Sequence, residues 1–246
     1  MKYAIIAAGE GSRLASEGIQ RPKPLVEVGG ECLIDRLVRI FTDNGATDIV
    51  VICNDRSGDV AQHLIRLQRD GLKGRPVPVR FVVKSTPSSM HSFFEISKFL
   101  TDEPFILTTV DTVFREDEFR AYVQSFCQLV WSPREGTIPI DGLMGVTDFV
   151  DDEKPLWVAT DKQLRITAFQ DEGRGCRYVS AGIYGLQPSS VFTLNNCIAR
   201  AESRMRNFQR ALVAEGQRLQ AWPFSKVMDV DHAGDISKAE QFLAMG

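Results

Sequence analysis

Gly9 and Gly11, two arginines and a lysine follow a short apolar run near the start of the chain, in IIAAGEGSRLASEGIQRPKPLV (residues 5–26). Gly9 and Gly11 would let backbone N–H groups approach a ligand with no Cβ between them. Arg13 can contact two phosphate oxygens at once, and Lys23, held between two prolines, adds a second positive charge. This combination favours binding of a triphosphate. For the glycines alone, a structural turn with solvated neighbours is the alternative.

The glycine loop differs from two common phosphate-binding motifs. A P-loop has the pattern G-x-x-x-x-G-K-[ST], but no lysine followed by a hydroxyl residue comes after these glycines. A dinucleotide-binding fingerprint, G-x-G-x-x-G, has a third glycine where this chain has Leu14. The loop therefore indicates a phosphate site of another kind.

Acidic residues that follow apolar segments form a candidate metal site. Asp111 comes at the end of the strand-like run FILTTV, and Asp229 and Asp231 lie in the alternating run KVMDVD. Mg²⁺ prefers one or two carboxylates together with water and substrate phosphates. We expect Asp111 to bind metal rather than to cap the following helix. For Asp231 and Asp235, solvation or helix capping is the competing interpretation.

The elements that must position these residues alternate between two periodicities. Four short apolar runs predict buried strands, and four amphipathic stretches predict helices: strands at 3–8, 49–53, 79–83 and 105–109, and helices at 32–45, 57–71, 88–100 and 115–128. This α/β order predicts a mostly parallel sheet flanked by helices on both faces. Ligands of such sheets bind beyond the carboxyl ends of the strands, where both the glycine loop and Asp111 would lie.

The pattern changes at about residue 138. The region 138–187 is β-rich and predicts a smaller insertion that is laid into the sheet or against it. Helices are expected at 188–203, 205–215 and 233–244, with one strand at 218–224 between them. We expect a single domain over 1–246, with a nucleotide-binding half at 1–130 and a C-terminal part, 188–246, that carries the second metal acid.

The composition bounds the partners of the protein. The 246 residues carry a net charge of −3, which gives no support to a nucleic acid or an anionic membrane as partner. The five cysteines are widely spaced, which argues against a disulfide framework and a zinc site. No apolar segment is long enough to be a secretory signal or to cross a bilayer. We expect a cytoplasmic protein, and the sequence does not indicate its oligomeric state.

The spaced elements AAGEGSRL and RPKPLVEVGG resemble the signature of the nucleotidyltransferases that activate sugar 1-phosphates, A-A-G-x-G-[ST]-R-[LM] followed by P-K-P. The resemblance implies a Rossmann-like fold and metal-assisted transfer of a nucleoside monophosphate from an NTP, with release of pyrophosphate. It implies that the backbone from Ala7 through Ala8 and Gly9 to Gly11 holds the nucleotide. It also implies that Arg13 contacts the β- and γ-phosphates and that Lys23 bridges the reacting phosphates. Asp111 and Asp229 align with the Mg²⁺ ligands, and Asp231 is the alternative to Asp229.

Three stretches depart from the family pattern and bear on the acceptor. PSSMHSFF has Ser88 and Ser89 where the family has a Gly-Thr pair that contacts base and ribose, which is similar to the choline-phosphate cytidylyltransferase branch. QDEGR replaces E-K-P, whose lysine holds the sugar phosphate in the family, so Arg174 would have to substitute. VSAGIYGL, in the β-rich region 138–187 that would lie on the acceptor side, keeps the A-G-I-Y strand of the family. Ser180 and Gly182 of this strand are expected to contact the acceptor, together with Asp231.

These observations predict a Mg²⁺-dependent nucleotidyltransferase whose first expected acceptor is a sugar 1-phosphate. A phosphocholine-like acceptor is the alternative, because Asp171 and Glu172 make the acceptor-side loop acidic and a tryptophan could contact a cation. A nucleotide-binding homologue without turnover is a second alternative, against which the retained metal acids argue. A molybdenum-cofactor-type nucleotidyltransferase is a third, and it would be expected to lack a substantial β insertion.

Overall fold

The computed structural model describes residues 1–56, 58–131 and 139–245. The strands are β1 (Lys2–Ala7), β2 (Glu27–Val28), β3 (Glu31–Cys32), β4 (Asp48–Cys53), β5 (Val79–Val83), β6 (Phe105–Thr109), β7 (Thr112–Phe114), β8 (Gly142–Thr147), β9 (Trp157–Thr160), β10 (Ile166–Gln170), β11 (Tyr178–Leu186), β12 (Leu219–Phe224) and β13 (Val227–Asp229). The helices are α1 (Ser12–Ser16), α2 (Leu33–Asp43), α3 (Gly58–Asp70), α4 (Ser89–Ser97), α5 (Glu116–Trp131), α6 (Ser190–Ala199), α7 (Met205–Ala214) and α8 (Ala233–Ala244), with a short 3₁₀ helix at Lys23–Leu25.

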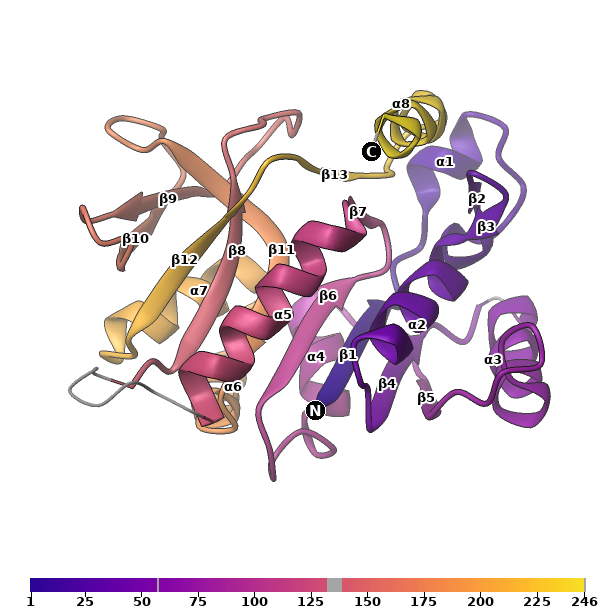
Figure 1. Cartoon of the computed structure of the whole chain (residues 1–246), viewed down its shortest axis with the longest axis horizontal. Helices are drawn as coiled ribbons and strands as arrows, with labels where there is room; N and C mark the ends of the chain where they lie inside the picture. The colour runs from indigo at the N-terminus through magenta and orange to yellow at the C-terminus, as the bar shows by residue number, and fades with distance from the viewer. Residues whose placement is uncertain (57, 132–138, 246) are drawn as a thin grey trace.

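The parallel half of the central sheet has the order β6-β1-β4-β5. Both of its faces are buried, since alternate residues of β1 pack into two different apolar clusters. Tyr3 and Ile5 pack with residues of α2, α3 and α5, while Ala4 and Ile6 pack with residues of α4, α6 and α7. Figure 1 shows α2 and α5 in front of the sheet and α4 behind it. A strand covered on both faces has no polar side, so its sequence is a continuous apolar run. The expected Rossmann-like sheet with helices on both faces is confirmed.

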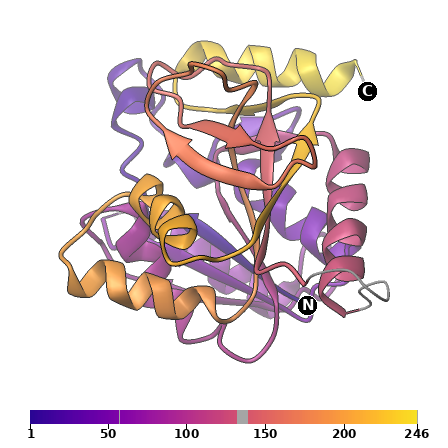
Figure 2. The ribbon, with the colours of Figure 1, turned by 90° about the vertical axis from the view of Figure 1, so that its left-hand side faces the viewer.

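The strands between residues 142 and 224 extend the same sheet. β11 pairs antiparallel with β6, β8 and β9, and β12 pairs parallel with β8. In Figure 1 these strands lie on the left, opposite α2 and α3, and Figure 2 shows them from their outer side. The β-rich acceptor-side region is therefore continuous with the nucleotide-binding half through the pairing of β11 with β6. Two first positions of the expected segments, Ser57 of the helix at 57–71 and residue 138 of the β-rich region, lie outside the described residues.

The helix ends follow local signals in the sequence. α2 ends at Asn44-Gly45, and Gly45 has the left-handed φ of 75° that such a helix end requires. α8 has the expected bounds, whereas α6 ends at Ala199 because the chain then turns through positive φ values at Ala201 and Arg204. Among the described residues, no helix is long and apolar enough to cross a membrane.

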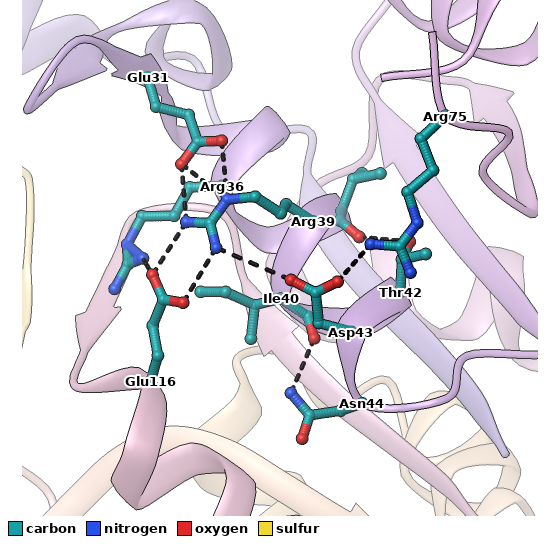
Figure 3. Close-up of polar contacts among 10 residues, drawn as sticks. Glu31, Arg36, Arg39, Ile40, Thr42, Asp43, Asn44, Arg75 and Glu116 are labelled. Carbon is teal, nitrogen blue, oxygen red and sulfur yellow. Dashed lines mark hydrogen bonds and ion pairs between the residues drawn. The ribbon is translucent and has the colours of Figure 1, made fainter. Parts of the chain in front are cut away.

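An ion-pair network joins α2 to β3 and to the start of α5 (Figure 3). The buried Arg36 donates to the Phe114 carbonyl at 2.6 Å and to Glu116 at 2.8 Å. Arg39 donates to Glu31 at 2.8 Å and to both carboxylate oxygens of Glu116, at 2.8 and 2.9 Å. The network fixes the end of β7, the strand that begins directly after the candidate metal ligand.

We expect Glu116→Gln to destabilise the protein at neutral pH and to lose this effect in acid. The hydrogen bond from Arg39 and the charge of Arg36 lower the pKa of Glu116 to about 2, although burial of the carboxylate acts in the opposite direction. Because this folded-state pKa lies below the value of about 4.3 for an unfolded chain, the stabilisation is present above about pH 4.5 and is lost as the pH falls toward 2. The side chain is 41% exposed, so screening keeps the effect to roughly 1 kcal/mol or less.

Melting temperatures of wild type and Glu116→Gln, measured from pH 7 to pH 3, test this expectation. The difference between the two should shrink below pH 5. Asp117→Asn is the matched control, because Asp117 is an exposed acid on the same helical turn. Its difference from wild type should show no such trend. A difference that stays constant down to pH 3 would mean that the Glu116 carboxylate charge does not stabilise the fold.

Candidate active site

The glycine loop, the P-K-P segment and the turn before α4 line one cavity of about 560 Å³ at the carboxyl ends of β1 and β6. The expected nucleotide-binding and catalytic residues that line it are Ala8, Gly9, Gly11, Ser88, Ser89, Arg13, Lys23 and Asp111. Ala7 is buried at the end of β1 and lines a neighbouring cavity instead. The structure thus brings together most of the set that the sequence singled out, and the role of each residue stays a prediction.

The glycine loop packs directly against Lys23. Gly11 has a φ of 62°, and a Cβ at this position would lie 3.2 Å from the Cβ of Lys23. Glycine is therefore required both for the left-handed backbone and for the close approach. From the end of β4, Asn54 Nδ2 donates to the Gly9 carbonyl at 3.2 Å. Sequence reasoning missed Asn54, although its place directly after a predicted strand puts it at the same sheet edge as the loop.

Lys23 and Arg13 form one ion-pair cluster with two of the candidate acids. The Lys23 side chain is 9% exposed, and its Nζ contacts Asp111 as well as Asp231, the latter at 2.5 Å. Burial opposes the charge of Lys23, but Asp111 and Asp231 outweigh it and raise the lysine pKa. Arg13 Nη1 donates to Asp231 at 2.9 Å. The cluster places both expected cations in the lining of this cavity.

A two-stranded ladder brings the two expected metal acids together. β13 pairs antiparallel with β7, with Asp229 opposite Thr112, and the Val230 N–H donates to the Asp111 carbonyl at 3.0 Å. The ladder joins residues that are more than a hundred positions apart in the chain. Sequence reasoning proposed both acids but not the pairing that makes them neighbours.

The pair Asp111 and Asp229 fits a divalent cation. Asp111 Oδ1 is buried and has no hydrogen-bond partner in the described part of the chain. Asp229 is exposed toward a cavity, and the protein atoms around its other sides, together with Asp111, raise its carboxyl pKa above the usual range. An unpaired buried oxygen of Asp111 beside a second carboxylate indicates negative charge that Lys23 alone does not compensate. Across the described residues no three His, Cys, Asp or Glu side chains converge as a metal site, so phosphates and water would supply the other ligands.

The acids around the start of α8 have different hydrogen-bond and ion-pair partners. Asp231 pairs with both Lys23 and Arg13 while its side chain stays 39% exposed, so it is partly solvated but has two cationic partners that the competing interpretation did not include. Asp235 accepts hydrogen bonds from the N–H of His232 at 2.8 Å and of Asp231 at 3.2 Å, so its interpretation as a helix cap is confirmed. Glu17, at the end of α1, accepts from the first N–H of α8 at 2.6 Å and pairs with His232. Figure 1 shows the resulting contact between α8 and α1 at the end of the molecule away from the N-terminus.

A second cavity, of about 210 Å³, adjoins the first toward the β-rich region. Arg13 and Asp231 line both cavities, and Ser180 of β11 lines the second. Its acidic lining residues come from the loop after β8 and from the segment around α8: Asp151, Asp152, Glu153, Asp229, Asp231 and Asp235. Among the described residues, one arginine and one lysine line this cavity, Arg13 and Lys238. This cavity is the candidate acceptor site.

Two expected acceptor contacts lie elsewhere. Arg174, in the loop between β10 and β11, is exposed and is not among the residues that line the second cavity. Gly182 has a φ of 70° and packs toward the hydroxyls of Thr109 and Thr112, also outside the cavity. Of the expected acceptor residues, Ser180 and Asp231 are the two that the structure places there.

The acidic loop was expected to face the acceptor, and this expectation is corrected. Asp171 is bound by Arg206 at 2.9 Å and by Arg210 at 2.7 Å, so two arginines compensate its charge outside the cavity. Trp157 packs against the backbone of Gly173, where an added Cβ would lie 2.6 Å from the indole ring. The aromatic residue that lines the acceptor cavity is Phe149.

Comparison with known proteins gives a family match over the first half of the chain. The model of the MobA-like NTP transferase domain matches residues 3–138, more than half of the chain. Glucose-1-phosphate cytidylyltransferase of Salmonella typhimurium is 38% identical over 53 residues, which cover 22% of this chain and 21% of that protein. The bifunctional IPC transferase and DIPP synthase of Rubrobacter xylanophilus is 41% identical over 80 residues, 32% of this chain and 16% of that protein. The chain thus spans about a fifth or less of the length of these curated relatives.

Solved structures match the fold over nearly the whole chain. The inositol-1-phosphate CTP transferase from T. maritima has a TM-score of 0.72 at 18% identity, with 98% of this chain and 97% of that chain covered. A structure assigned to a glucose-1-phosphate thymidylyltransferase from Bacillus anthracis has a TM-score of 0.80 at 21% identity, covering 98% and 94%. CTP:phosphocholine cytidylyltransferase from Streptococcus pneumoniae has a TM-score of 0.71 at 15% identity, covering 98% of each chain. These similarities establish the fold.

Proposed function

This chain belongs to the family of MobA-like NTP transferase domains, and on that basis we propose that it transfers a nucleoside monophosphate from an NTP to a phosphorylated small molecule. The observation that carries the proposal is the ion-pair cluster of Arg13 and Lys23 with Asp111 and Asp231. The cluster lies between a cavity lined by a glycine loop and a second cavity that opens beside it. Two substrates bound in these cavities would meet at Arg13 and Asp231, which line both of them.

In the proposed reaction an oxygen of the acceptor phosphate attacks the α-phosphorus of the NTP. The bond between the α-phosphorus and the bridging oxygen breaks in line, and pyrophosphate leaves with the bonding electrons. The attacking oxygen is already anionic, so the step needs no general base. Lys23 would exchange its carboxylate partners for the reacting phosphates, and Arg13 would contact the β- and γ-phosphates. Mg²⁺ held by Asp111 and Asp229 would neutralise phosphate charge.

We propose CTP as the donor and a sugar 1-phosphate as the acceptor. The Salmonella relative and the proteins of the structures from T. maritima and S. pneumoniae are named as cytidylyltransferases or as a CTP transferase. Carboxylates accept hydrogen bonds from hydroxyl groups, so the acids that line the second cavity suit a sugar. The same acids also favour the second candidate, an acceptor such as phosphocholine that carries a cation beside its phosphate.

A pyrophosphate-release screen tests this function. The four common NTPs are each combined with glucose 1-phosphate, inositol 1-phosphate and phosphocholine in the presence of Mg²⁺. We expect the largest rate with CTP and glucose 1-phosphate. A rate that appears with phosphocholine and with neither sugar-type acceptor would select the cationic candidate. No release of pyrophosphate from any pair would contradict the proposed transfer.

A further inference from the structure

The second cavity presents a charge problem for any phosphorylated acceptor. Six carboxylates from the described part of the chain line it, and a phosphate dianion enters such surroundings only beside a positive partner. The described lining residues include one arginine, Arg13, and one lysine, Lys238. Arg13 is bound to Asp231 and also lines the nucleotide cavity. Its charge is shared with the NTP phosphates in the proposed function. The acceptor phosphate therefore needs a partner of its own.

We propose that Lys238 of α8 binds the phosphate of the acceptor. This inference rests on the proposed function and names a residue that takes the place expected for Arg174. Lys238 lines the second cavity, whereas Arg174 does not. Its position on α8 also relates it to the reacting centre, because Asp229 and Asp231 lie in the segment that leads directly into the same helix.

The contacts of Lys238 leave it one hydrogen-bond donor for a ligand. Its Nζ lies 3.0 Å from Asp235 and 3.5 Å from Asp151, the two carboxylates within ion-pair distance in the described part of the chain. A lysine ammonium has three N–H donors, so one stays available. The side chain is 55% exposed and its four-carbon stem is flexible, which lets Nζ follow a bound phosphate.

The two partners hold the ammonium group at the cavity wall. Asp235 is fixed as the cap of α8, and Asp151 belongs to the loop after β8. Lys238 thus bridges two of the elements that border the second cavity. A phosphate that binds there would add a third, doubly charged partner to an ammonium group that is already positioned.

Kinetics of Lys238→Met test the proposal, with CTP as donor and glucose 1-phosphate and phosphocholine as separate acceptors. We expect the acceptor KM to rise about 10- to 100-fold, the loss expected for one charge-assisted contact, with the CTP KM within about twofold of wild type. Lys238→Arg should recover part of the loss. Lys162→Met, which removes an exposed lysine in the turn between β9 and β10, is the matched control and should leave both constants unchanged.

A double variant separates direct contact from a change in cavity charge. Lys238→Met/Asp151→Asn removes one positive and one negative group, so the net charge of the cavity equals that of wild type. We expect the acceptor KM to stay raised in the double variant. A KM restored to the wild-type value would mean that Lys238 only offsets Asp151, and the proposal would be overturned.

The outcomes distinguish this inference from the proposed function. A wild-type enzyme that turns over an acceptor while Lys238→Met keeps the same acceptor KM refutes the role of Lys238 alone. A raised acceptor KM in Arg174→Met instead would assign the phosphate to Arg174. A wild-type enzyme that releases pyrophosphate with neither acceptor contradicts the proposed function, and the inference fails with it.

Discussion

Asp111→Asn is expected to lower kcat for pyrophosphate release at least ~100-fold while the protein keeps its fold. Asp111 carries the buried oxygen without a hydrogen-bond partner, beside the charge of Lys23. The amide removes the negative charge that would hold Mg²⁺ at the reacting phosphates. The shape of the side chain is kept, and the hydrogen bond from Val230 goes to the backbone carbonyl of Asp111, so the β7–β13 ladder should persist. Steady-state kinetics together with circular dichroism measure both parts of this expectation.

Asp229→Asn should reduce turnover by a similar factor, because the ladder places Asp229 beside Asp111. Asp171→Asn is the matched control, since Asp171 is bound by two arginines outside both cavities, and its turnover should be close to wild type. Near-normal turnover of Asp229→Asn combined with loss of activity in Asp231→Asn would identify Asp231 as the second metal ligand instead.

Lys23→Ala is expected to lower kcat at least ~100-fold and to change the dissociation constant of CTP far less. The lysine is buried against the glycine loop and held by Asp111 and Asp231, so its charge lies where the α-phosphorus would be attacked. An interaction that strengthens as charge develops in the transition state affects kcat more than binding. Titration calorimetry with CTP and steady-state kinetics separate the two effects.

Arg21→Ala is the matched control for Lys23→Ala. Arg21 lies two residues away in the same segment, is exposed and pairs with Glu27, so its removal should leave kcat near the wild-type value. A raised KM for CTP with an unchanged kcat in Lys23→Ala would show that Lys23 binds the nucleotide without assisting the transfer.

The nucleotide-binding half could be predicted from sequence because its signals are local. Strands buried on both faces appear as continuous apolar runs, and a helix end such as Asn44-Gly45 is encoded by adjacent residues. The glycine loop follows the first strand directly, so its place at the sheet edge is a consequence of chain order. The ladder between β7 and β13 has no such signal, since each strand has three residues and the pairing depends on how the C-terminal segment docks.

The acceptor side was harder to predict because tertiary ion pairs determine which residues face the cavity. Arg174 was expected there from its place in a loop that departs from the family pattern. That loop instead carries Asp171, which pairs with Arg206 and Arg210 outside the cavity. Lys238 reaches the cavity because Glu17 fixes the start of α8 against α1, a contact between residues more than two hundred positions apart.

The most direct test of the proposed transfer is a ³¹P NMR spectrum of the wild-type protein with CTP, glucose 1-phosphate and Mg²⁺. We predict that one pyrophosphate appears for each new diphosphate diester, and that EDTA abolishes both signals. Phosphocholine in place of the sugar phosphate distinguishes the two acceptor candidates in the same experiment. A spectrum that shows no diester with either acceptor, or that shows CTP hydrolysed to CDP and inorganic phosphate, would contradict nucleotidyl transfer at this site.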